Sequence, residues 1–145
     1  MHLAGNDGTS LVFGVVGYQF PDLVGVPYDS NWLIIAGRAE KDRRGWKFND
    51  PCLLTNEVSS LADWFEARSQ DPTKDSEISF IEPNLSFKWL GGTLRVTLAL
   101  ECRPPWAPWD QVDEFYLQLS PTSEHLALAA LSLRDDLRKF PIRPE

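Results

Sequence analysis

Residues 85–98 read LSFKWLGGTLRVTL, two runs of alternating apolar and polar side chains on either side of a Gly-Gly pair. Gly-Gly between such runs is typical of a two-residue β-hairpin turn, because both central residues of that turn need a positive φ. With these glycines as the turn, the predicted facing pairs on one side are all apolar: Trp89 with Leu94, Phe87 with Val96, and Leu85 with Leu98. Turn chemistry and hydrophobic pattern therefore predict the same hairpin, made of residues 85–90 and 93–102.

The opposite face of this hairpin pairs Lys88 with Arg95. Two like charges directly opposite each other are mildly destabilising. The pair therefore predicts either an exposed surface or an acidic neighbour.

The first half of the chain predicts three strands and a helix. Val, Ile and aromatic residues on alternating faces indicate strands at 11–20 and 31–40, with a shorter strand around 46–48 that Asp50-Pro51 ends. Apolar residues then recur at helical spacing, which predicts a helix that begins with Thr55 as its N-cap and is followed by the polar loop 69–76.

The remaining elements complete an α+β layout. We expect short strands at 78–81 and 115–119, and a final helix that starts near Ser120-Pro121 and stops at Pro141. The predicted order is β-β-β-α-β-β-β-β-α, with a mainly antiparallel sheet of about six to seven strands and two amphipathic helices. We expect one domain over residues 1–145, with residues 1–9 as a loosely ordered terminus.

Charge is concentrated in the middle of the chain. The net charge is −7, and residues 51–120 hold 11 acidic but only 5 basic side chains. Such a field repels a phosphate backbone, so we expect no direct nucleic-acid binding and a preference for basic partners, although solubility alone would also account for the charge. No segment resembles an export signal or a membrane span, which predicts a cytoplasmic protein without membrane contact.

The residue types that usually carry chemistry are scarce or have simpler roles. There are two histidines, His2 and His125, and two distant cysteines, so neither a Cys-His pair nor a zinc or disulfide framework is indicated. Asp29, Asp50 and Glu82 could bind a metal or act as acid and base, but each occupies a turn-like sequence. We therefore predict a protein that is not an enzyme and holds no metal or cofactor.

The segment RPPWAPWD (103–110) is the main anomaly. It carries two tryptophans on a proline-stiffened loop, a form that either caps an open end of a sheet or presents rigid aromatic anchors to a partner. Acidic residues follow it, and others face water on the first predicted helix. The candidate protein-binding residues are Trp106, Trp109, Asp110, Asp113, Glu114, Asp63 and Glu66.

Six short motifs along the chain resemble, in order and spacing, the WapI family of bacterial immunity proteins. They are GYQFP (17–21), YDSNWL (28–33), DPCLLT (50–55), EPNLSF (82–87), RPPW (103–106) and FP (140–141). The resemblance covers residues 11–141. It implies a cytoplasmic antitoxin that binds the C-terminal toxic domain of a cell-wall-associated or polymorphic contact toxin, in the founding case a nuclease acting on tRNA.

The residues and the resemblance together favour a toxin-neutralising binding protein that acts by occlusion. A non-enzymatic adaptor or self-associating module is an alternative, and a carboxylate- and metal-dependent hydrolase is a weaker one. The sequence leaves the toxin, the binding face and the oligomeric state open.

Overall fold

The hairpin predicted from the Gly-Gly pair lies at the centre of one of two sheets. The computed structural model describes residues 1–5, 7–108 and 115–145. Strands β6 (Leu85–Leu90) and β7 (Thr93–Leu98) are joined by Gly91 and Gly92, with φ of 57° and 86°. The observed register pairs Leu85 with Leu98, as predicted, so the hairpin is confirmed. The second strand ends at Leu98 and not at residue 102, because the chain turns into a 3₁₀ turn at Leu100–Cys102.

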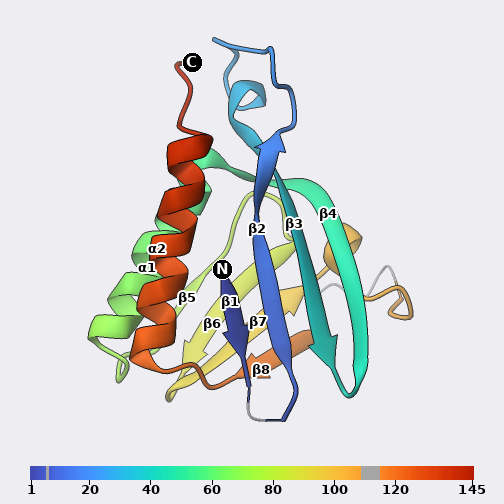
Figure 1. The fold of residues 1–145 in the computed structure, drawn as a ribbon, viewed down its shortest axis with the longest axis vertical. Helices are drawn as coiled ribbons and strands as arrows, with labels where there is room; N and C mark the ends of the chain where they lie inside the picture. Colours follow the sequence, from blue (N-terminus) through green and yellow to red (C-terminus); the bar gives the residue numbers. More distant parts are fainter. Residues whose placement is uncertain (6, 109–114) are drawn as a thin grey trace.

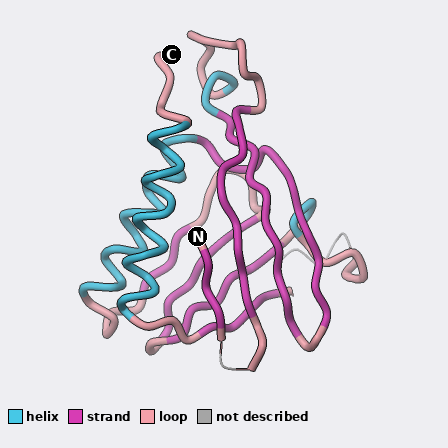
Figure 2. Tube along the Cα trace, viewed as in Figure 1, coloured by secondary structure: helices cyan, strands magenta, loops and turns pink. Residues whose placement is uncertain are grey.

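The described residues form two four-stranded antiparallel sheets and two α-helices (Figures 1 and 2). The first sheet has the order β1-β2-β3-β4, and the second has the order β5-β6-β7-β8. The remaining elements are β1 (His2–Ala4), β2 (Ser10–Tyr18), β3 (Trp32–Lys41), β4 (Arg44–Leu54), α1 (Thr55–Gln70), β5 (Ser76–Ile78), β8 (Tyr116–Leu119), α2 (Ser123–Lys139), and the 3₁₀ turns η1 (Asp29–Asn31) and η2 (Leu100–Cys102).

The α+β class and the predicted order of elements are confirmed. Several features differ from the prediction. The strands divide into two sheets, residues 2–4 form β1 instead of a loose terminus, and the strand predicted at 78–81 is observed at Ser76–Ile78. The Met1 ammonium donates to the Phe13 carbonyl at 2.7 Å, and the Leu3 side chain is buried. Burial lowers the pKa of this ammonium. These contacts hold the N-terminal residues against β2.

The Asp50-Pro51 pair does not end the third predicted strand. β4 runs for 11 residues through it, because the register against β3 shifts at this point. Leu33 pairs with Leu53 and Ile35 with Asp50, so Pro51 lies in a bulge, where its missing N–H removes no ladder hydrogen bond. The strand prediction was wrong in length because proline is compatible with a bulge.

The core lies between the two sheets, and the helices close one flank. Buried side chains from both sheets and both helices form one apolar cluster. In Figure 1 the two helices lie side by side on one flank of the sheets. α2 is tied to the sheet where the Asp136 carboxylate accepts a hydrogen bond from Val15 N at 3.0 Å. Neither described helix is long and apolar enough to cross a membrane.

The helix starts differ slightly from the predicted ones. Thr122, two residues after the predicted cap Ser120, accepts from His125 N and caps α2. Thr55 is the first residue of α1, and its hydroxyl donates instead to Asn31 at 2.9 Å. The N-terminus of α1 is closed by Glu57, whose carboxylate accepts from Leu54 N.

Candidate functional site

Trp106, the described tryptophan of the RPPWAPWD loop, packs onto the side of the sandwich away from the helices. Its ring stands edge-on to Trp46 at 5.4 Å between centroids, and the Arg44 guanidinium lies 3.8 Å over it. Trp46 is buried, and its Nε1 donates to the Cys102 carbonyl at 3.0 Å. Trp106 is still 37% exposed. These contacts favour the capping role for Trp106 and leave part of the residue accessible.

We expect Trp106→Ala to destabilise the fold by about 2 kcal/mol, since it removes an aromatic pair and a cation–π contact. Trp106→Phe should recover part of this loss because an aromatic ring still covers Trp46. Urea unfolding of the three proteins is the measurement. Equal stability of the wild type and Trp106→Ala would show that Trp106 is not a cap.

Among the other predicted binding residues, Asp63 and Glu66 lie in the described part of the chain, and they do not form one surface with Trp106. Trp109, Asp110, Asp113 and Glu114 lie outside the described residues. Asp63 and Glu66 are on α1, and the helix pair lies across the sheets from the segment that follows β7 (Figure 1).

Asp63 and Glu66 both bind Arg134 of α2, at 2.9 and 2.6 Å. The two carboxylates raise the pKa of Arg134. Both acids face water, as predicted, but they also join the two helices. Their use in partner binding stays a prediction.

The buried amide of Asn84 binds the carboxylates of Glu101 and Asp50. Asn84 is fully buried, and its Nδ2 donates to Glu101 at 2.8 Å and to Asp50 at 3.3 Å. Burial, followed by the charges of Glu101 and Glu82, raises the pKa of Asp50 from 3.8 to about 6. The structure thus brings together Asp50 and Glu82, two of the carboxylates considered from sequence, whereas Asp29 lies in η1. Among the described residues no group of three or more potential metal ligands was found.

The raised pKa of Asp50 predicts a pH-dependent stability. Because the folded protein binds the Asp50 proton more tightly than the unfolded chain does, ionisation of Asp50 lowers the free energy of unfolding. This loss is complete above pH 6 and disappears as the pH falls toward 3.8. We expect Asp50→Asn to raise Tm by about 3 °C at pH 8, with a smaller gain at pH 4.5. Asp42→Asn, at an exposed turn, is the control for the substitution itself. A pH-independent difference between Asp50→Asn and the wild type would contradict this account.

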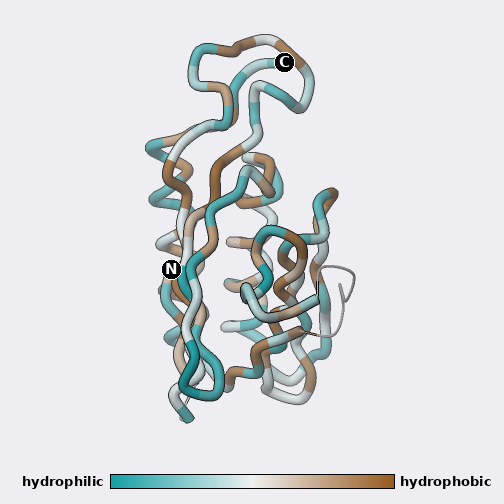
Figure 3. The backbone as a smooth tube through the Cα atoms, turned by 90° about the vertical axis from the view of Figure 1, so that its right-hand side faces the viewer, coloured by the Kyte–Doolittle hydropathy of each residue, from teal (hydrophilic) through white to brown (hydrophobic). Residues whose placement is uncertain are grey.

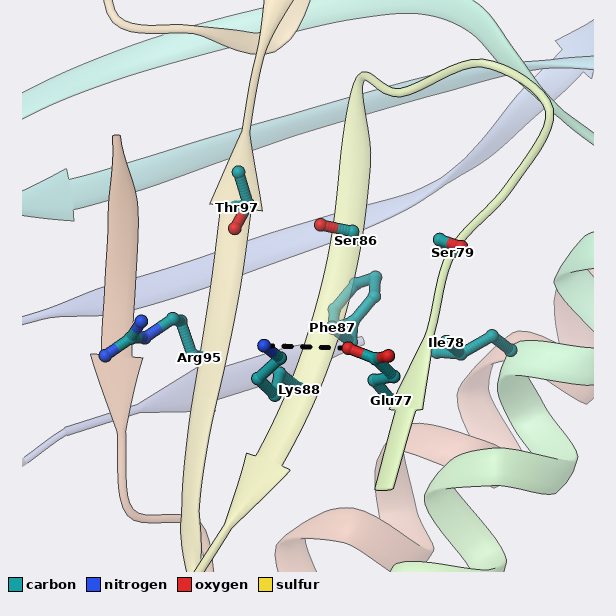
Figure 4. Close-up of a pocket in the computed structure, with 8 residues that line it drawn as sticks. All are labelled: Glu77, Ile78, Ser79, Ser86, Phe87, Lys88, Arg95 and Thr97. Carbon is teal, nitrogen blue, oxygen red and sulfur yellow. Dashed lines mark ion pairs between the residues drawn. The ribbon is translucent and has the colours of Figure 1, made fainter. Parts of the chain in front are cut away.

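A shallow pocket of about 370 Å³ lies on the outer face of the second sheet (Figure 4). Its lining residues are Glu77, Ile78, Ser79, Ser86, Phe87, Lys88, Arg95 and Thr97. Lys88 pairs with Glu77 at 3.6 Å, and the Arg95 guanidinium lies 4.2 Å over the Tyr116 ring. Lys88 is exposed and Glu77 is its acidic neighbour, so both predicted alternatives are present for Lys88. Because these charges already have partners within the sheet, the pocket is better suited to weak polar contacts than to catalysis.

His125 and the two cysteines lie on three different elements: His125 in α2, Cys52 in β4 and Cys102 in η2. His125 lies in the first turn of α2. Cys52 and Cys102 are free and buried. A hydrogen bond with Cys102 and burial raise the pKa of Cys52, which keeps it a protonated thiol and a poor nucleophile.

Sequence reasoning missed an exposed apolar surface formed by residues 19–28 and 141–145, called here the apolar tip. Five exposed large apolar side chains gather in it: Phe20, Val24, Val26, Tyr28 and Ile142. A signal was present in the sequence, since residues 20–28 contain apolar residues and two prolines without strand alternation. What the sequence does not show is that the C-terminal residues fold against this loop.

Comparison with known proteins identifies the family. The model of the immunity protein WapI-like family matches residues 2–141, nearly the whole chain. No curated protein and no solved structure matches. The matched range includes both sheets and both helices, and it confirms the resemblance carried by the six sequence motifs. The chain therefore belongs to the WapI-like immunity protein family.

Proposed function

We propose that this immunity protein is a bacterial antitoxin that binds the C-terminal toxic domain of its cognate contact toxin and covers the toxin's working surface. The observation that carries the proposal is the family match over residues 2–141. Inhibition occurs by occlusion in the cytoplasm of the producing cell, without a chemical step by the immunity protein.

The roles of the located carboxylates support a binding function. Glu57 accepts hydrogen bonds from the backbone of Leu54 and Ile81, and Asp136 accepts one from Val15. Asp63 and Glu66 hold Arg134. These acids have structural partners, as expected of a protein that uses its carboxylates for folding and for surface charge.

The net charge of −7 supports a basic toxin domain, most simply a nuclease. A nuclease needs Lys and Arg side chains to hold a phosphate backbone, and an acidic protein is drawn to such a surface by long-range attraction. The same charge keeps the immunity protein away from the RNA substrate. Negative charge therefore both speeds capture and prevents competition with nucleic acid.

The test is a calorimetric titration of the purified chain with the toxin domain encoded by the adjacent gene, at rising salt. We expect a complex at low salt whose affinity falls as salt screens the charges. A toxin domain encoded beside an unrelated immunity gene is the control and should not bind. The absence of a complex at low salt, or no protection of cells that express the toxin domain, would refute the proposed function.

A further inference from the structure

The apolar tip lies at the end of the molecule where the loop after β2 meets the C-terminal tail (Figures 1 and 3). It holds five of the twelve large apolar side chains that are exposed among the described residues. Monomeric proteins rarely gather exposed apolar side chains in one place unless the surface meets a partner.

Arg143 fixes the loop from the tail side. Its Nη1 donates to the carbonyls of Phe20 and Leu23, at 3.0 and 2.8 Å, and its Nη2 donates to the carbonyl of Pro21 at 2.6 Å. The guanidinium also lies 3.4 Å over the Tyr18 ring. One cation therefore orders three loop carbonyls.

Asn31, which is buried, ties the tail to the body of the protein. Its Nδ2 donates to the Arg143 carbonyl at 3.0 Å, and its Oδ1 accepts from Arg143 N at 2.8 Å. The same oxygen accepts from the Thr55 hydroxyl at the start of α1. Gly25 N adds a hydrogen bond to the Pro144 carbonyl. The loop and tail are thus held in one arrangement, which lowers the entropy cost of binding.

Tyr28 shows that this arrangement carries strain. It has φ 63° and ψ −58°, and Asp29 N donates to the Pro27 carbonyl at 2.8 Å, which together define a rare γ-turn that is unfavourable for a non-glycine residue. The strained residue presents an aromatic ring that is 58% exposed. Strain of this kind persists at binding surfaces, where the side chain it presents has a use.

The charged side chains around the apolar tip are acidic, which favours a partner with basic side chains. The exposed charged side chains in these two segments are the carboxylates of Asp22 and Glu145, and the exposed carboxylate of Asp29 directly follows the first segment. Arg143, the basic residue of the two segments, is turned inward onto the loop carbonyls. An apolar centre with an acidic rim complements an apolar pocket rimmed by Lys or Arg.

We propose that the apolar tip is the anchor that this immunity protein inserts into a pocket, rimmed by basic residues, on its toxin domain. The proposal rests on the proposed function, and it assigns the contact to residues 19–28 and 141–145. Arg143 and Asn31 act as positioning residues that hold the anchor in shape.

The test uses Tyr28→Gly and Val24→Ser in the full chain, titrated with the toxin domain encoded by the adjacent gene. Glycine suits the positive φ at position 28, so Tyr28→Gly should not lower Tm. Each variant should weaken toxin binding roughly tenfold or more, as expected for an anchor residue. Leu128→Ser on α2 is the matched control, because Leu128 is 55% exposed and Val24 is 61% exposed. It should bind with wild-type affinity.

The positioning role has its own readout. Arg143→Ala should weaken toxin binding and speed amide hydrogen exchange in residues 20–28, while exchange in the β6–β7 hairpin stays unchanged. Unchanged exchange in 20–28 would show that Arg143 does not order the loop.

The outcomes separate this proposal from the proposed function. Failure of the wild type to bind the toxin domain would refute the proposed function itself. If the wild type binds the toxin domain and the tip variants bind it with the same affinity, only the anchor is overturned. The same holds if Leu128→Ser loses as much toxin affinity as the tip variants. The anchor would also be overturned if the tip variants reduced self-association of the chain but kept the wild-type affinity for the toxin domain.

Discussion

Gly37→Ala is expected to destabilise the protein by about 3 kcal/mol, although it adds a single methyl group. Gly37 lies in β3 between Phe13 of β2 and Phe48 of β4. A Cβ at this position would meet the Val12 carbonyl oxygen, the Phe48 ring at 2.5 Å and Phe13 Cβ at 2.7 Å. Backbone on one side and buried aromatic rings on the other leave no room for relaxation. Urea unfolding measures the loss.

The matched control for this prediction is Gly17→Ala in β2. A Cβ at Gly17 would have no neighbour within 4 Å, so the change should stay within about 1 kcal/mol. If both alanine variants unfold at the same urea concentration, close packing at Gly37 does not limit stability.

Phe87→Ala is expected to cost about 4 kcal/mol, the largest loss for a single substitution in this account. Phe87 is buried in β6, and four aromatic rings surround it at centroid distances of 5.5 to 6.4 Å: Phe13, Trp64, Phe65 and Phe80. Phe87 lies in the second sheet, whereas the four rings come from the first sheet, α1 and the segment after β5, so a cavity at Phe87 loosens several elements at once. The measurement is the free energy of unfolding in urea.

Leu90→Ala provides the comparison within the same strand. Leu90 is 43% exposed, so its truncation leaves no cavity and should cost less than about 1 kcal/mol. Similar losses in the two variants would contradict the central role of the Phe87 cluster.

The elements that could be predicted from the sequence are those set by a turn or by a hydrophobic pattern within a few neighbouring residues. The β6–β7 hairpin followed from Gly91-Gly92 and from alternation on each side, and α1 followed from apolar spacing. Pro51 was misinterpreted because a bulge depends on the partner strand. The division into two sheets depends on packing between distant segments, which a single run of residues does not encode.

The candidate binding surface was harder to predict for the same reason. Trp106 stood out by composition, but its edge-on contact with Trp46 joins residues 60 positions apart. The apolar tip is ordered by Arg143, which contacts carbonyls more than 110 residues earlier in the chain. Such contacts leave no pattern in the local sequence, so sequence reasoning found the tryptophan loop and missed the tip.

We propose that this immunity protein works by covering its toxin without performing chemistry. The most direct measurement titrates a fixed amount of the purified toxin domain encoded by the adjacent gene with the chain and follows the remaining toxin activity. We expect inhibition to be complete at equimolar amounts, immediate, and reversed when high salt dissociates the complex. Lasting inactivation of the toxin by substoichiometric amounts, progressing with time, would mean that the protein acts as an enzyme and would contradict the account.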